Sequence, residues 1–155
     1  QIIHLTGYLD WPEIQAAVEE LSPEQRQRYR AYPYLHQEMG AALRSADLVV
    51  SRAGASTLGE FPLFELPAIL VPYPHAWRYQ KVNARYLENM GAAVVLPDED
   101  LPAQLAELVL ELVKENDRLE MMKNAMRNLA HPRAADMIAG ILVDCAGVPA
   151  GENCL

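Results

Sequence analysis

The sequence is poor in cysteine, in basic residues and in long apolar runs. Its two cysteines, Cys145 and Cys154, have no metal-ligand spacing, which indicates a reducing compartment and no disulfide framework. Lys and Arg number 13 against 21 Asp and Glu, and the formal charge of -8 excludes a broad nucleic-acid-binding surface. Apolar runs such as LPAILVPYP are far shorter than the roughly 20 residues needed to span a membrane.

What is present is typical of a folded α/β domain, since 51% of the 155 residues are hydrophobic. Continuous apolar runs, typical of strands buried on both faces, occur at IIHLTG, YRAYPYL, DLVVSRAG, AILVPYP and AAVVLP. Helical patterns lie between them, at 12–21, 23–29, 37–45, 55–64 and 79–90. This alternation predicts a Rossmann-like parallel sheet with helices on both faces.

After Leu96 the pattern is helical only. We expect helices at 101–114, 117–129 and 132–145, with Asp100, Asn116 and His131 as their N-caps. Residues 1–145 are therefore predicted to form one domain, and 146–155 an irregular tail. The chain opens at Gln1 directly on a strand-like run, so we expect it to be part of a longer protein.

The stretch ADLVVSRAGASTLGE leads from a strand through glycine into a helix. Gly54 allows close backbone approach, and the N–H groups of 55–57 at the helix start suit an anion. The glycine spacing is that of a P-loop, but Glu60 stands where that motif has its lysine. Glu60 therefore has two interpretations: it binds a ligand, or it only closes a capping box with Thr57.

The stretch VPYPHAWRYQKVNA, after the fourth apolar run, gathers aromatic, amide and cationic side chains at the same predicted ligand edge. Amide groups on the entry turn of a helix suit sugar hydroxyls, and the alternative is a solvated turn. The candidates here are His75, Trp77, Arg78, Tyr79, Gln80 and Asn83.

Other polar groups favour structural roles. Asp98-Glu99-Asp100 resembles a D-x-D metal motif, but it directly precedes a helix, where acids are favoured as caps, so we expect no metal there. No Ser-His-Asp, Cys-His or H-E-x-x-H constellation occurs, and no histidine stands out as catalytic.

Three stretches together resemble the C-terminal, donor-binding domain of MurG-type UDP-N-acetylglucosamine transferases of glycosyltransferase family 28: ADLVVSRAGASTLGE, LPAILVPYPHAWRYQKVNARYLENMGAA and HPRAADMIAGI. The resemblance runs from about Gln1 to Val143. It implies one half of a two-domain GT-B fold, with the other half binding the acceptor. The implied reaction is inverting transfer of GlcNAc from UDP-GlcNAc to undecaprenyl-pyrophosphoryl-MurNAc-pentapeptide (lipid I) in peptidoglycan synthesis.

The resemblance also implies roles for individual residues. Glu60 aligns with a glutamate that accepts from ribose hydroxyls, and Gln80 with a glutamine that holds GlcNAc hydroxyls. Leu35 aligns with the position whose backbone reads uracil. Gly54, Ala55 and Ser56 would face the diphosphate, and the expected binding set also contains Arg52, His75, Tyr79 and Asn83.

The sequence departs from the family pattern at three places. The chain opens at what corresponds to the second strand of the family's domain, so we expect the first strand and its Gly-rich loop to precede Gln1. Tyr79 occupies a site that is often His or Gln, and Glu65 replaces a usual glycine.

As a whole, the resemblance implies a cytoplasmic protein peripheral to the inner face of the cell membrane. Its expected partners are a UDP-sugar and, through the other half, a lipid-linked acceptor, with no nucleic acid, cofactor or metal and with the catalytic residues in that other half. The chain alone is expected to be inactive, and an exposed sheet edge favours dimerisation. Two alternatives stay open: an enzyme resembling UDP-GlcNAc 2-epimerases, and a non-catalytic UDP-sugar-binding module that works with a partner chain.

Overall fold

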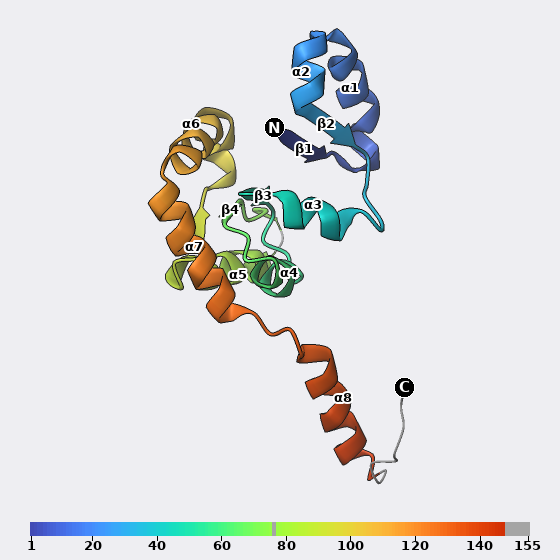
Figure 1. Cartoon of the computed structure of the whole chain (residues 1–155), viewed down its shortest axis with the longest axis vertical. Coiled ribbons are helices and arrows are strands. Elements are labelled where there is room, and N and C mark those ends of the chain that lie inside the picture. Colours follow the sequence, from blue (N-terminus) through green and yellow to red (C-terminus); the bar gives the residue numbers. More distant parts are fainter. Residues whose placement is uncertain (76, 148–155) are drawn as a thin grey trace. The chain divides into compact units, whose positions relative to one another are not determined.

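Strands and helices alternate along the chain as far as Val95, and helices follow (Figure 1). Every strand pair in the described residues is parallel. The computed structural model describes residues 1–75 and 77–147. The chain divides into two compact units, Gln1–Ala46 and Asp47–Leu155. The α/β class with parallel pairing is confirmed, and the strands form two sheets, one of two strands and one of three. Residues 148–155, most of the expected irregular tail, lie outside the described residues.

The first unit is built around one parallel strand pair. β1 and β2 pair in the register Ile2 to Tyr29, and the two helices between them form the crossover. The elements in order are β1 (Ile2–Leu5), α1 (Gly7–Glu20), α2 (Pro23–Arg28), β2 (Tyr29–Tyr32) and α3 (Met39–Ser45).

Of the two crossover helices, α2 begins where the sequence predicts and α1 does not. The start of α2 is as expected: the Ser22 hydroxyl accepts from the Gln25 N–H at 3.3 Å, the Gln25 side chain accepts from the Ser22 N–H, and Pro23 opens the helix. The expected start of α1 at Pro12 is wrong, because the helix already begins at Gly7. A proline inside a helix removes one backbone hydrogen bond, and here the helical turn continues through it.

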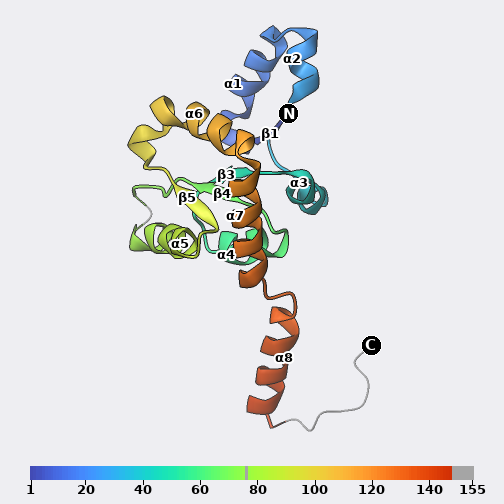
Figure 2. The same ribbon diagram turned by 60° about the vertical axis from the view of Figure 1, so that its left-hand side comes forward.

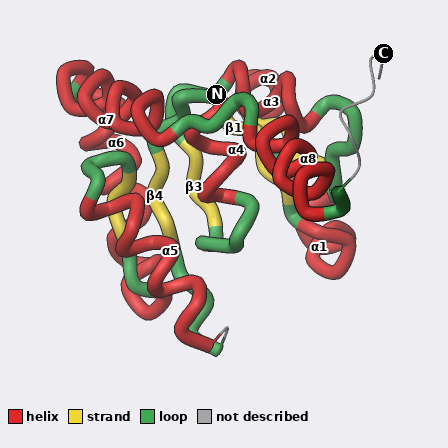
Figure 3. The backbone as a smooth tube through the Cα atoms, turned by 90° about the horizontal axis from the view of Figure 1, so that it is seen from below, coloured by secondary structure: helices red, strands yellow, loops and turns green. Residues whose placement is uncertain are grey.

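The second unit contains a three-stranded sheet in the order β3-β4-β5, with helices between its strands and after them (Figures 2 and 3). The central strand β4 is buried at every residue, as its continuous apolar sequence predicts. The elements are β3 (Val49–Ser51), α4 (Thr57–Leu63), β4 (Ala68–Leu70), α5 (Trp77–Asn89), β5 (Ala93–Val95), a 3-10 turn η1 (Asp98–Asp100), α6 (Leu101–Lys114), α7 (Asn116–Leu129) and α8 (Ala134–Cys145).

The hydrophobic core of this unit joins the sheet to α6 and α7. Leu112 of α6 and Met122 of α7 pack with Ile69 of β4 in one buried cluster. Burying each such side chain contributes about 1.5–3 kcal/mol. Helices α6 and α7 therefore form a layer packed on the sheet.

Several expected caps are not formed. Asp100 precedes α6 as predicted, but its side chain makes no capping hydrogen bond. Helix α7 begins at Asn116, with Glu115 and not Asn116 before it, and α8 begins at Ala134 after Arg133, not at Pro132 after His131. A cap-forming residue type near a helix start therefore does not determine which residue begins the helix.

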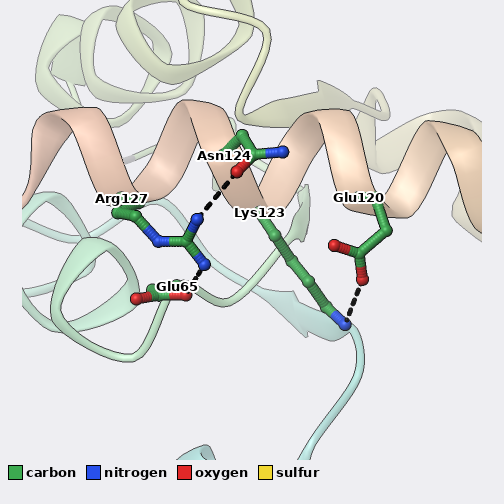
Figure 4. A network of polar contacts seen from close by, with 5 residues as sticks. All are labelled: Glu65, Glu120, Lys123, Asn124 and Arg127. Atoms are coloured by element: carbon green, nitrogen blue, oxygen red, sulfur yellow. Dashed lines mark hydrogen bonds and ion pairs between the residues drawn. The ribbon is translucent and has the colours of Figure 1, made fainter.

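Glu65, at a position where the family resemblance implies a glycine, lies in the left-handed backbone region, with φ 53°. Its carboxylate accepts from Nη2 of Arg127 on α7 at 2.5 Å, and Arg127 also donates to Asn124 (Figure 4). The hydrogen bond and the charge of Glu65 raise the pKa of Arg127 above its usual range. The same face of α7 carries the Lys123–Glu120 pair (Figure 4). The contact between Glu65 and Arg127 ties α7 to the turn between α4 and β4.

Helix α8 differs from the other long helices of this unit, because all its residues are exposed, including Met137, Ile138, Ile141 and Leu142. Among the helices in the described ranges, none has both the length and the hydropathy to cross a membrane.

Candidate functional site

The candidate site is the edge of the second sheet at which its strands end. Because β3, β4 and β5 are parallel, their carboxyl ends meet at one edge, which is where open α/β sheets bind ligands. The segments that leave this edge are 52–56, 71–75 and 96–98.

The first of these segments has unpaired backbone donors. The N–H groups of Gly54, Ala55 and Ser56 make no hydrogen bond within the described residues. Thr57 was also expected to offer its N–H, and that expectation is wrong: it donates to the Gly54 carbonyl at 3.3 Å. A Cβ built on Gly54 would meet no atom within 4 Å, so this segment is open to an approaching group.

The carboxylate of Glu60 closes no capping box. Ser56 is the N-cap of α4, and the Thr57 hydroxyl donates to the Gly54 carbonyl at 2.6 Å instead of accepting from the helix. Glu60 is exposed, and its side chain makes no hydrogen bond or ion pair within the described residues. The capping interpretation is therefore wrong, and the carboxylate is left with acceptor capacity for a ligand.

Two amide side chains of α5 fix the neighbouring loops. Oε1 of Gln80 accepts from the Tyr73 N–H at 2.8 Å, which leaves the Nε2 donors without a partner in the described chain. Nδ2 of Asn83 donates to the Ala53 carbonyl at 3.0 Å. Asn83 thus joins α5 to the loop after β3, and Gln80 joins α5 to the segment after β4.

A contact that the sequence reasoning missed crosses all three segments. Nη1 of Arg52 forms an ion pair with Asp98 and donates to the Val71 carbonyl at 3.2 Å. The Arg52 guanidinium also lies 5.4 Å from the centre of the Tyr73 ring, a cation–π distance. Ligands bind where parallel strands end, and this rule was applied to the first four apolar runs only. Applied to the fifth run as well, it would have placed Asp98 at this edge.

The other expected residues of this unit lie along the segment after β4. His75 is exposed, and its ring meets the Tyr73 ring edge to face at 5.5 Å. Tyr79 is 71% exposed on the first turns of α5. Ala76 lies outside the described residues, as do the side chains of Trp77 and Arg78.

Leu35 belongs to the first unit, where it is half-buried after β2. Its neighbour Tyr34 stacks on Tyr8 with ring centres 6.4 Å apart, and His36 tilts against Tyr34 at 4.7 Å. Sequence reasoning missed this row of exposed rings.

A cavity of about 500 Å³ in the first unit is not at a ligand edge. Its lining includes Ile2 and Tyr29, which begin β1 and β2, apolar residues of α1, and the polar residues Gln1, Gln25 and Arg28. The cavity therefore lies at the amino ends of the strands, whereas open α/β sheets bind ligands at the carboxyl ends. The polar edge of the second sheet is for this reason the better candidate site.

Comparison with known proteins places the chain in a family. The profile of the glycosyltransferase family 28 C-terminal domain matches residues 1–138. The chain is 39% identical over 150 residues to the UDP-N-acetylglucosamine–N-acetylmuramyl-(pentapeptide) pyrophosphoryl-undecaprenol N-acetylglucosamine transferase of Halothermothrix orenii, covering 94% of this chain and 40% of that protein. It is 38% identical over 148 residues to the enzyme of the same name from Methylococcus capsulatus, again covering 94% and 40%.

Solved structures agree on the fold. The chain matches the crystal structure of Acinetobacter baumannii MurG with a TM-score of 0.76 at 24% identity, covering 92% of this chain and 41% of that one. It matches the glycosyltransferase VinC in complex with dTDP with a TM-score of 0.63 at 22% identity, covering 95% and 42%. The chain spans about two fifths of the length of these proteins, and it belongs to the glycosyltransferase family 28 C-terminal domain family.

Proposed function

We propose that the chain is the donor-binding part of an inverting glycosyltransferase that transfers GlcNAc from UDP-GlcNAc to lipid I in peptidoglycan synthesis. One observation carries the proposal. A single turn-to-helix segment has unpaired N–H groups at 54–56 and a carboxylate, that of Glu60, which makes no capping hydrogen bond. N–H groups suit a diphosphate, and a carboxylate accepts from ribose hydroxyls. The names of the relatives supply the donor and acceptor classes.

Each group has a task in this proposal. Gly54, Ala55 and Ser56 donate to the diphosphate, and Glu60 accepts from the ribose. Gln80 offers its Nε2 donors to hexose hydroxyls while its Oε1 stays on the Tyr73 N–H. For the remaining residues of the expected binding set, the predicted contacts are these: the backbone at Leu35 with uracil, and Arg52, His75, Tyr79 and Asn83 with the donor.

The reaction needs charge stabilisation at the leaving group. An acceptor hydroxyl attacks the anomeric carbon from the face opposite UDP, so the bond to the diphosphate oxygen breaks and the configuration inverts. Negative charge grows on the diphosphate as that bond breaks. Donors that are already fixed and have no other partner stabilise this charge without reorganising, which favours the transition state over the bound donor.

The location follows from the chemistry of the two substrates. A nucleotide sugar is dissolved in the cytoplasm, whereas a lipid-linked acceptor is held at the membrane. We therefore infer a cytoplasmic protein peripheral to the inner face of the membrane, with the acceptor and its proton-accepting group held by another part of the protein or by a partner.

Glu60→Gln tests the proposal directly. We expect UDP binding to weaken by about 1–3 kcal/mol, the scale of a hydrogen bond to a charged group. The free energy of unfolding should change by less than about 0.5 kcal/mol, because the carboxylate has no partner in the described structure. Calorimetric titration with UDP and a urea melt measure the two quantities.

Glu107→Gln is the matched control, since Glu107 is an exposed acid on α6 without a contact in the described chain. It should change neither quantity. Unchanged UDP affinity in Glu60→Gln would remove the carboxylate from the site. In the complete gene product, formation of UDP-ManNAc from UDP-GlcNAc without acceptor would replace the transferase by an epimerase.

A further inference from the structure

The loops at the ligand edge converge on Arg52, whose ion-pair partner is Asp98. Asp98 follows β5, whereas Arg52 follows β3 and lies 46 positions earlier in the chain. β4 separates these two strands in the sheet, and Arg52 also donates to the carbonyl of Val71, just after β4. One guanidinium therefore connects the ends of all three strands.

The contacts continue from Arg52 to the segment that carries the amide of Gln80. The Arg52 guanidinium lies over the Tyr73 ring, and the Tyr73 N–H donates to Oε1 of Gln80. Pro72 and Pro74 flank Tyr73, and because proline fixes its own φ, the segment has few ways to adjust. The orientation of the Gln80 amide, and so of its Nε2 donors, depends on where Tyr73 is held.

We propose that Asp98 is a positioning residue of the donor site, acting through Arg52 and Tyr73 on the amide of Gln80. The role in donor binding rests on the function proposed above. Asp98 touches no substrate in this proposal: it neutralises and orients Arg52, which would otherwise be a mobile cation at the edge of the site. The hexose contact should therefore depend on Asp98 more strongly than the contacts to the nucleotide.

The test compares UDP with UDP-GlcNAc. In Asp98→Asn we expect UDP-GlcNAc affinity to fall about two- to fivefold, the range of an ion pair whose side chains are 46% and 32% exposed. UDP affinity should fall less, so the ratio of the two affinities changes. Asp98→Glu keeps the carboxylate and should restore the ratio in part, and in an Arg52→Gln background Asp98→Asn should have no further effect.

Glu99→Gln is the matched control, because Glu99 lies in the same turn, carries the same charge and makes no contact in the described chain. It removes one negative charge as Asp98→Asn does, so it measures the effect of net charge alone. An equal change of the affinity ratio in Glu99→Gln, or an unchanged ratio in Asp98→Asn, would overturn the proposal.

Amide hydrogen exchange separates this inference from the proposed function, since it needs no ligand. Asp98→Asn should raise exchange at the Tyr73 amide, and Glu99→Gln should not. Unchanged exchange would show that Asp98 does not hold Tyr73 and would overturn the inference by itself. A second outcome is faster exchange in Asp98→Asn while the unsubstituted protein binds neither UDP nor UDP-GlcNAc. That outcome would overturn both the donor-site role of Asp98 and the proposed function, although Asp98 would still hold the loops together.

Discussion

The two units use the same kind of apolar strand in different surroundings. β1 and β4 both lie in largely apolar runs, yet Ile2 of β1 is 57% exposed and Ile69 of β4 is fully buried. In the first unit no residue is buried, whereas the second holds the hydrophobic core. β4 has a strand on each side and the core contacts of α6 and α7, while β1 has one paired strand. An apolar run predicts a strand, and its neighbours decide how far it is buried.

The largest expected effect comes from comparing a leucine in each unit. Leu112→Ala removes a fully buried side chain of α6 and should lower the free energy of unfolding by about 2–5 kcal/mol. Leu9→Ala, at a residue 96% exposed on α1, should change it by less than about 0.5 kcal/mol. Urea melts followed by circular dichroism measure both, and equal losses would contradict the difference in burial.

A smaller effect is expected at Glu65, a residue of the second unit that has an unfavourable left-handed backbone conformation. Glu65→Ala keeps the Cβ in the left-handed region and loses the carboxylate, whereas Glu65→Gly loses both. The glycine variant should be more stable than the alanine variant by about 1 kcal/mol, because a left-handed residue with a Cβ is strained. Thermal melts of the pair give the difference, with Arg127→Ala as the control that removes the ion pair, together with the hydrogen bond to Asn124, and leaves the Glu65 backbone unchanged. Identical melts of the two Glu65 variants would argue against backbone strain.

An effect no larger than that at Glu65 is expected at the N-cap serines, one in each unit. The Ser22 hydroxyl caps α2, and Ser22→Ala should destabilise that helix by about 1 kcal/mol. Ser56 stands before α4 without a capping bond, so Ser56→Ala should leave stability nearly unchanged. Hydrogen exchange at the Gln25 amide, which donates to Ser22, measures the first, and a urea melt the second. A larger loss at Ser56 would reverse the assignment of caps.

The sequence predicted the strands better than the helix starts. All five strands occur where continuous apolar runs indicate them, because burial of a strand leaves a pattern that is local in sequence. The predicted starts of α1 and α8 are wrong, because Pro12 lies inside α1 and Pro132 precedes α8, so neither proline marks a first turn. The predicted start of α2 at Pro23 is correct, because the two partners of its cap, Ser22 and Gln25, lie within one turn.

The site shows the same division between local and distant contacts. The glycine loop and Glu60 could be identified from their order along the chain, but whether Glu60 capped its own helix depended on where α4 begins. The contact between Arg52 and Asp98 joins segments that follow two strands separated by a third. No periodicity predicts such a pair; it follows only when strand order is combined with the rule that parallel strands end at one edge.

The strand order of the second sheet also bears on how the unit folds. β3, β4 and β5 pair in the order in which they occur, with a single helix between each strand and the next. Each pairing therefore closes a short stretch of chain, and the entropy lost on closing a stretch grows with its length. Assembly can add one strand and one helix at a time, without waiting for distant segments to meet. A parallel sheet built in this way has a lower contact order than one whose neighbouring strands are far apart in sequence, and the unit should fold correspondingly fast.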